Sequence, residues 1–152
     1  MLKGRCLCGK VRYEIDGALG PVVMCHCSMC RRASGSAFAS NASVEARAFR
    51  IVSGEKSVKA FKSSNDGFRT FCKKCGSPLY GGSKSFPYVV RVRLGSLEDS
   101  GGAHPAAHIW HGSKSEWFQI TDQLNRYEQE PPTDLLMPGA RAKSGNKKKK
   151  KH

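Results

Sequence analysis

Seven cysteines grouped in three short motifs constrain this chain more than any other feature of its sequence. They stand in Cys6-Leu-Cys8, in Cys25-His-Cys27-Ser-Met-Cys30 and in Cys72-Lys-Lys-Cys75. An odd number does not suit a disulfide framework, and the N-terminal residues contain no apolar run of signal-peptide length. In a reducing compartment, clustered cysteines more often bind metal or carry out chemistry. We therefore expect a cytoplasmic metal-binding protein.

Length and composition are those of a globular protein. The chain has 152 residues, of which 39% are hydrophobic, so one domain with a substantial core is expected. No segment approaches the roughly 20 apolar residues that cross a bilayer. A membrane protein is not expected.

Short alternations of apolar and polar residues, often flanked by glycine, predict a mainly β fold with little helix. Strands are predicted at residues 11–15, 44–52, 58–62 and 88–95. In the last of these, alternation places Val90, Val92 and Leu94 on one face and Arg91 and Arg93 on the other. A short helical turn is predicted between Ser113 and Leu124.

The composition changes near residue 132, where prolines are followed by a basic run. Residues 141–152 carry seven basic side chains and no acid, which is half of the formal net charge of +14. Runs of like charge are typical of disordered, solvated tails. We expect a folded domain at residues 1–131 and a basic, disordered tail at residues 132–152. The alternative is an arm that binds nucleic acid.

Seven thiolates divide naturally into four, which close a structural zinc site, and three, which leave one coordination position open as in catalytic zinc sites. Spacing allows two partitions. In one, Cys6, Cys8, Cys72 and Cys75 form the closed site, and Cys25, Cys27 and Cys30 form the open one. In the other, Cys27 and Cys30 join Cys72 and Cys75. The first is favoured because one continuous segment then supplies all three ligands of the open site.

Other interpretations of the three-cysteine motif remain open. A histidine could complete a second closed site, the candidates being His26, His104, His108 and His111. A redox-active cysteine pair is a further alternative. A zinc deaminase is disfavoured because the chain lacks the HxE element that supplies its general acid and base.

Four segments together resemble the glutathione-dependent formaldehyde-activating enzymes, a family that also includes centromere protein V. The segments, in the family's order, are GRCLCGKVRYE at residues 4–14, CHCSMCRRASGS at 25–36, FCKKCGSPLY at 71–80, and LGSLED with HPAAHIWHGSKSEWFQITD between residues 94 and 122. The resemblance covers about residues 3–131 and leaves the basic tail outside.

The resemblance implies an Mss4-like zinc-binding β fold with two zinc sites. We expect two Zn²⁺ ions per chain, the second of them labile. Structural zinc would be held by Cys6, Cys8, Cys72 and Cys75, and catalytic zinc by Cys25, Cys27 and Cys30. The implied activity is that of a carbon–sulfur lyase that forms or cleaves S-(hydroxymethyl)glutathione or a related thiol–aldehyde adduct. The substrate would be glutathione or its hydroxymethyl adduct. The alternative is a nucleic-acid or chromatin-binding zinc module that uses the lysine-rich tail.

Glutathione carries two carboxylates, so basic residues near the three-cysteine motif are candidates for binding it. Arg31 and Arg32 directly follow that motif and are predicted to bind a carboxylate. Arg91 and Arg93 are secondary candidates. Trp110 and Trp117 are expected to lie in the core.

Overall fold

A computed structural model of the chain describes residues 1–138, and these residues form a mainly β structure. The described part contains one α-helix, α1 (Ser28–Ser34). It also contains five single 3₁₀ turns, at Ala46–Ala48, Glu55–Ser57, Leu94–Ser96, His111–Ser113 and Thr133–Leu136. The expected fold class, mainly β with little helix, is thus confirmed. Within residues 1–138, no helix has the length and apolar character needed to cross a membrane.

The strands form two sheets. The smaller sheet is antiparallel, in the order β1 (Leu2–Arg5), β2 (Arg12–Ile15) and β5 (Phe49–Ser53). The larger sheet has the order β11 (Asn125–Arg126), β10 (Pro105–Ile109), β3 (Val22–Cys25), β4 (Ala39–Glu45), β9 (Val89–Arg93), β8 (Pro78–Ser83), β7 (Gly67–Cys72) and β6 (Val58–Lys62). In it, β10 runs parallel to β3 and β11, and the other neighbours are antiparallel.

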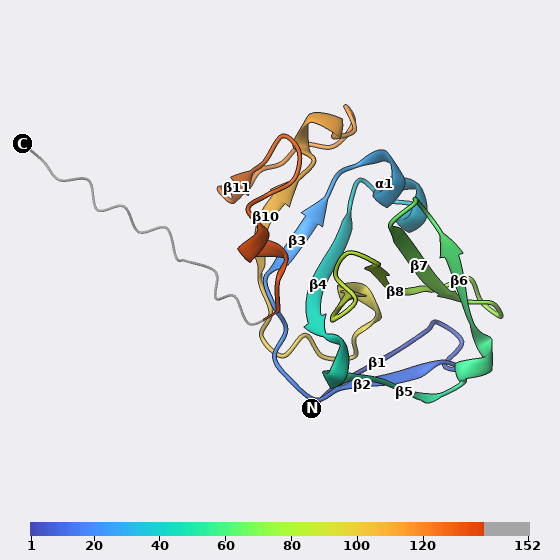
Figure 1. The fold of residues 1–152 in the computed structure, drawn as a ribbon. Helices are drawn as coiled ribbons and strands as arrows, with labels where there is room; N and C mark the ends of the chain where they lie inside the picture. Colours follow the sequence, from blue (N-terminus) through green and yellow to red (C-terminus); the bar gives the residue numbers. More distant parts are fainter. Residues whose placement is uncertain (139–152) are drawn as a thin grey trace, which may run out of the picture.

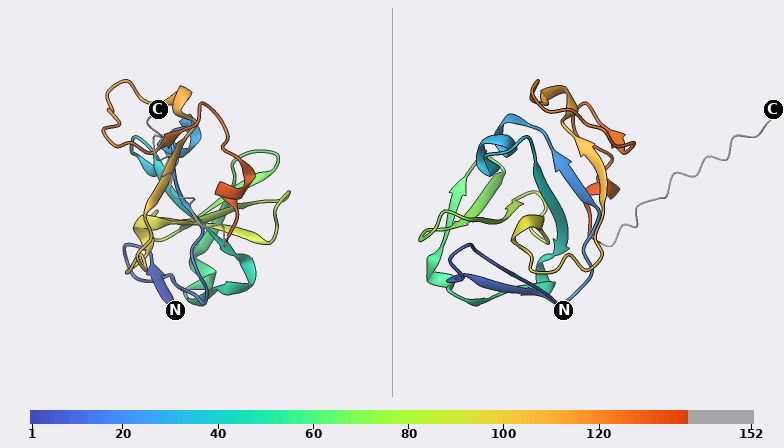
Figure 2. Two further views of the ribbon diagram at one scale, coloured as in Figure 1. Left: turned by 90° about the vertical axis from the view of Figure 1, so that its left-hand side faces the viewer. Right: turned by 180° about the vertical axis from the view of Figure 1, so that it is seen from behind.

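The smaller sheet lies at the end of the molecule that holds the N-terminus, and α1 lies at the opposite end (Figures 1 and 2). The main core contains residues from both sheets, including Tyr13 and Ile15 of β2 and Val44 and Val92 of the larger sheet. A second, smaller cluster lies near α1, around Val23, Cys25, Cys30, Ala39 and Ile109. The two cysteine-rich regions are therefore associated with different core clusters.

The strand predicted at residues 58–62 is confirmed as β6, and that at 88–95 is largely confirmed as β9. The alternation is confirmed within β9, because Val90 and Val92 pack in the main core whereas Arg91 and Arg93 line a cavity, but Leu94 lies beyond the strand in a 3₁₀ turn. The continuous strand predicted at 44–52 is wrong. The chain leaves the larger sheet after Glu45, turns through residues 46–48, and enters the smaller sheet as β5, so its two halves pair with different sheets.

The helical turn predicted between Ser113 and Leu124 is also wrong, since the nearest 3₁₀ turn ends at Ser113. In this segment, polar side chains form hydrogen bonds with backbone groups in place of the backbone hydrogen bonds of a helix. The Lys114 ammonium donates to the carbonyls of Ser115 and Phe118, and the Asp122 carboxylate accepts from the Leu124 amide. Hydrogen bonds of this kind compete with helix formation.

The segment that follows Pro131 packs back against the larger sheet as far as it is described. Ser43 Oγ on β4 donates to the Leu136 carbonyl at 2.6 Å, and Leu136 packs on the second core cluster. The described structure thus extends past the expected domain boundary at residue 131. The basic residues of the expected tail, including Lys147–Lys151, lie outside the described residues.

Candidate active site

Four cysteines that are distant in sequence meet beside the main core. Cys6 and Cys8 follow β1, Cys72 ends β7, and Cys75 lies in the turn after it. In that turn, the Gly76 amide donates to the Cys72 carbonyl at 2.7 Å with a φ of +75°, a conformation that glycine adopts readily. The four Sγ atoms lie within 4.8 Å of one another. We call Cys6, Cys8, Cys72 and Cys75 the four-cysteine group.

The spacing of these sulfurs suits tetrahedral zinc. A Zn–S bond of about 2.3 Å places two ligand sulfurs about 3.8 Å apart. The Sγ atoms of Cys6 and Cys8 are 3.5 Å apart, and those of Cys8 and Cys72 are 3.9 Å apart. Backbone amides also favour thiolates here, since donation from the amides of Cys8 and Ser77 lowers the pKa of Cys75 to about 6. Four such ligands fit a closed site.

The other three cysteines come from one continuous segment, which joins β3 to α1. Cys25 ends β3, Cys27 is the N-cap of α1, and Cys30 lies in the first turn of that helix. Cys27 Sγ accepts a hydrogen bond from the Cys30 amide at 3.3 Å, which turns the segment back on itself. The three Sγ atoms lie within 4.8 Å of one another. We call Cys25, Cys27 and Cys30 the three-cysteine group.

Within residues 1–138, no histidine or carboxylate joins the three-cysteine group as a further ligand. The structure thus brings the cysteines together as four and three, in the partition favoured above, and separates Cys27 and Cys30 from Cys72 and Cys75. Three thiols at this spacing fit a zinc ion with one open coordination position.

His26 lies between two of these cysteines in sequence but its imidazole is engaged elsewhere. Its Nε2 is 2.8 Å from His108 Nδ1, and His108 Nε2 is 3.0 Å from Asp122 Oδ2. Both rings are essentially inaccessible to solvent. Burial, followed by the charge of His108, lowers the pKa of His26 to about 4, so its ring is neutral at physiological pH. These two histidines form a buried support behind the cysteines.

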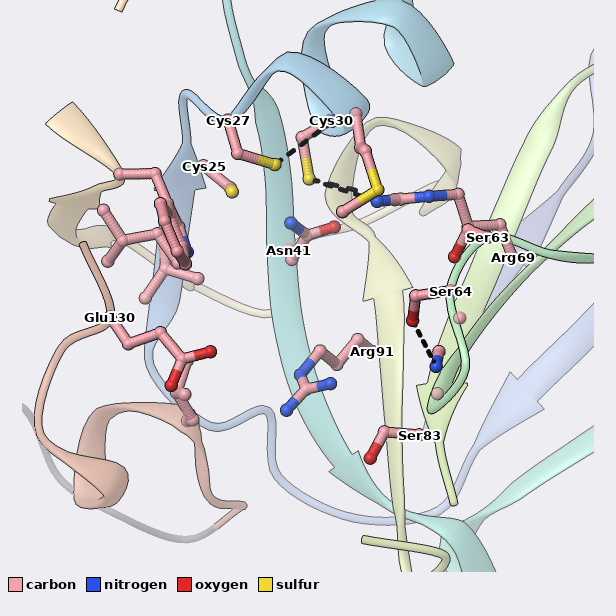
Figure 3. Close-up of a pocket in the computed structure, with 18 of the residues that line it drawn as sticks. Cys25, Cys27, Cys30, Asn41, Ser63, Ser64, Arg69, Ser83, Arg91 and Glu130 are labelled. Atoms are coloured by element: carbon pink, nitrogen blue, oxygen red, sulfur yellow. Dashed lines mark hydrogen bonds between the residues drawn. The ribbon is translucent and has the colours of Figure 1, made fainter. Parts of the chain in front are cut away.

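A cavity of about 450 Å³ opens beside the three-cysteine group. Its volume lies within the roughly 300–1,000 Å³ of small-molecule sites. Figure 3 shows the three sulfurs at one end, Arg91 and Glu130 farther along, and Ser63, Ser64 and Ser83 along one side. Hydrophobic side chains, among them Ile109 and Leu136, complete the lining.

Arg69 connects the cavity to the cysteines electrostatically. Its two terminal nitrogens lie 3.7 and 3.8 Å from Cys30 Sγ. Hydrogen bonding to Cys25 and Cys27 lowers the pKa of Cys30 strongly, and the charge of Arg69 lowers it further. Hydrogen bonds with Cys27 and Cys30 raise the pKa of Cys25, because a neighbouring thiolate holds the proton of the Cys25 thiol in place. Arg69 thereby favours the ionised form that a metal requires.

The arginines predicted from sequence are placed differently from those that line the cavity. Arg31 donates from Nε to the His26 carbonyl at 3.2 Å, and Arg32 is exposed on α1. Neither lines the cavity, whereas the secondary candidates Arg91 and Arg93 do, together with Arg69. Arg69 was not among the residues predicted from the sequence to bind substrate, although it alternates with the buried Thr70 along β7. Glu130 carries no recognisable motif.

Trp110 is the one non-glycine residue among residues 1–138 with a positive φ, at 53°. This left-handed conformation is unfavourable by about 1–2 kcal/mol for an L-residue and is unusual for a bulky one. Hydrogen bonds to the Gln129 carbonyl and from the Ser113 amide hold it. Trp110 is half-buried and lines the cavity, but Trp117 is 73% exposed, so the prediction that Trp117 lies in the core is wrong.

The sequence profile of the glutathione-dependent formaldehyde-activating enzymes matches residues 1–113 of the chain. That range contains all seven cysteines and the three arginines of the cavity. The chain belongs to this family. The resemblance noted in the cysteine motifs is therefore confirmed.

Two relatives of this family member extend the comparison. A protein of Halomonas elongata named for glutathione-dependent formaldehyde activation is 28% identical over 128 residues, which are 79% of this chain and 81% of that protein. A crystal structure of a Rhodobacter sphaeroides protein, determined in a structural genomics programme, superposes with a TM-score of 0.56 at 28% identity. It covers 68% of this chain and 91% of the other. The fold is thus shared with a solved structure.

The match to the family profile ends at residue 113, and some residues of the site lie beyond it. Asp122, Glu130 and Leu136 lie beyond residue 113, yet they contact the buried histidines or line the cavity. The metal-binding motifs thus lie within the family match, while one wall of the cavity is supplied by residues outside it.

Proposed function

We propose that this protein is a zinc-dependent enzyme of the carbon–sulfur lyase type, which forms or cleaves S-(hydroxymethyl)glutathione. One observation carries the proposal: three thiols from a single segment meet without a fourth ligand among residues 1–138, and they border a cavity lined by arginines. The family to which the chain belongs is named for glutathione-dependent activation of formaldehyde. Both point to a thiol and an aldehyde as the reactants.

Two zinc ions per chain are proposed, with different roles. The four-cysteine group would hold a structural ion, and the three-cysteine group a catalytic, more labile one. When bound at the three-cysteine group, zinc supplies an open coordination position for a substrate sulfur or oxygen and acts as a Lewis acid. The remaining contributions come from the chain itself.

The arginines of the cavity suit the charge of glutathione. Glutathione carries two carboxylates and one ammonium, and the cavity lining offers three arginines, Arg69, Arg91 and Arg93, and the carboxylates of Asp66 and Glu130. Arginine binds carboxylates through paired, charge-assisted hydrogen bonds. Ser64 Oγ accepts a hydrogen bond from the Gly67 amide, which leaves its hydroxyl hydrogen to donate. Carboxylate binding by Arg31 and Arg32 stays a prediction.

The reaction itself needs no oxidant. The sulfur of glutathione forms a bond to the carbonyl carbon of formaldehyde, the carbon–oxygen double bond becomes a single bond, and the thiol proton ends on oxygen through solvent. The chain contributes by binding the thiol near the three-cysteine group and by restricting its orientation, which reduces the entropic barrier.

Because thiols add to formaldehyde without a catalyst, the test must measure rate at equilibrium. Exchange NMR on a mixture of glutathione and ¹³C-formaldehyde would follow interconversion of free and adduct carbon, with zinc-loaded wild-type protein and with Cys27→Ser. We expect the wild type to accelerate exchange and Cys27→Ser to leave it at the uncatalysed rate. Equal exchange rates with the two proteins would contradict the proposal.

The alternative of a nucleic-acid or chromatin module rests on Lys147–Lys151, which lie outside the described residues. No observation on residues 1–138 specifically favours it. The glutathione reaction is therefore the one function proposed.

A further inference from the structure

Most of the charged groups that line the cavity are already engaged by other protein groups. Arg69 contacts Cys30 Sγ, and Arg93 donates to the side-chain oxygen of Asn41. The Asp66 carboxylate accepts from both the amide and the hydroxyl of Ser85, at 2.9 and 2.8 Å. Hydrogen bonds from the Ser83 side chain and from Ser85 lower the pKa of Asp66. These groups set the shape and potential of the cavity.

Arg91 and Glu130 differ from them. Within residues 1–138, neither side chain has a hydrogen-bond or ion-pair partner. Arg91 comes from β9, and Glu130 comes from the segment after β11. Figure 3 shows their charged ends pointing toward one another across the cavity, on the side away from the sulfurs of the three-cysteine group. Two opposite charges thus face each other without making direct contact.

We infer that Arg91 and Glu130 together bind the free α-amino-acid end of the thiol substrate. The carboxylate of that end would pair with Arg91, and its ammonium with Glu130. An α-amino acid presents these two charges on one carbon, so it can bridge the two side chains. This inference rests on the proposed function, and it defines the substrate class as thiols that carry a free α-amino-acid group remote from sulfur.

The pair distinguishes the two ends of glutathione. The glycyl end has a carboxylate alone, which would leave Glu130 facing a negative charge. The γ-glutamyl end has both charges, and several bonds separate it from the sulfur. With the γ-glutamyl end at Arg91 and Glu130, the sulfur reaches toward the cysteines at the other end of the cavity (Figure 3). The glycyl carboxylate is then left to the remaining arginines and serines.

Calorimetric titration of two ligands into zinc-loaded protein tests this orientation. The ligands are glutathione and des-amino glutathione, in which hydrogen replaces the ammonium group. We expect the wild type to bind des-amino glutathione about tenfold more weakly, because a charge-assisted hydrogen bond is lost. This comparison requires no variant and no change in folding.

Two variants and one control assign the effect to residues. Glu130→Gln should weaken glutathione binding about tenfold and leave des-amino glutathione unchanged. Arg91→Gln should weaken both ligands, because both retain the carboxylate. Glu128→Gln removes a nearby carboxylate that pairs with His111 and does not line the cavity, so it should change neither affinity.

The outcomes separate this inference from the proposed function. If wild type and Glu130→Gln bind glutathione equally well, the inference is wrong and the proposed function stands. The same conclusion follows if the wild type does not distinguish the two ligands. If zinc-loaded wild type binds neither ligand, the proposed function fails, and this inference fails with it.

Discussion

The buried pair of histidines behind the three-cysteine group gives the most specific energetic prediction. The Asp122 carboxylate accepts a hydrogen bond from His108 Nε2, and with a neutral His108 ring Nδ1 then accepts one from His26 Nε2. The His26 ring is fully buried and lies near Phe38 and Phe118, with ring centroids 5.4 and 6.0 Å away. No solvent can replace a lost partner there.

Replacing one histidine therefore leaves the other with an unsatisfied buried group. His108→Leu should lower the free energy of unfolding by about 1–3 kcal/mol, the usual penalty for a stranded polar group. The double variant His26→Leu/His108→Leu removes both polar partners, so it should be less destabilised than the sum of the single variants. The expected coupling energy is about 1–3 kcal/mol.

Urea unfolding of zinc-loaded protein at neutral pH would measure the three variants against wild type. If the loss of unfolding free energy in the double variant equalled the sum of the losses in the single variants, the hydrogen bond between His26 and His108 would be refuted. The matched control is Asp122→Asn. It retains the shape of the side chain at the exposed end of the His26–His108–Asp122 hydrogen bonds, so it should destabilise the protein less than His108→Leu. Because His26 stands between two cysteines of the three-cysteine group, His108→Leu should also weaken zinc binding at that group.

Three further predictions follow from the cysteines and the core. Cys72→Ser should prevent folding, because structural zinc contributes about 10–16 kcal/mol in small zinc domains. Cys27→Ser should fold and lose one zinc ion. Circular dichroism and metal analysis would measure both, and two folded variants would contradict this prediction. Arg69→Met should weaken zinc binding at the three-cysteine group about 10–100-fold, measured by chelator competition, and an unchanged affinity would exclude Arg69 as a partner of Cys30. Burial raises the pKa of Tyr13 to about 12, so the contribution of Tyr13 to stability should be constant below about pH 10. It should fall by about 2–3 kcal/mol between pH 10 and 12, as the unfolded state ionises. Ultraviolet titration that shows every tyrosine ionising near pH 10 would contradict the last.

Local patterns were sufficient to predict several parts of the structure. The alternation of Val90 to Arg93 correctly predicted a strand with a buried and a polar face, because a strand's period is a local property. The cysteine spacing correctly suggested groups of four and three, although only the folded chain decides which distant cysteines meet. The break after Glu45 was not predictable, because it depends on which sheet each half of the segment joins.

The ligand-facing residues were harder to predict than the metal-facing ones. Adjacency to the cysteine motif favoured Arg31 and Arg32, but a helix turns successive side chains to different faces, and these two do not line the cavity. Arg69 and Glu130 reach the cavity through pairing of β7 and packing of the segment after β11. Such tertiary contacts leave no signal in sequence spacing.

The central claim is that the three-cysteine group holds zinc with one position open to a thiol. X-ray absorption at the zinc edge would test it on protein loaded with two ions, before and after saturation with glutathione. Seven thiolates shared by two ions predict an average of about 3.5 sulfur atoms per zinc, which should rise to about 4 when glutathione supplies the missing ligand. An average that stays at its initial value with glutathione bound would contradict the claim.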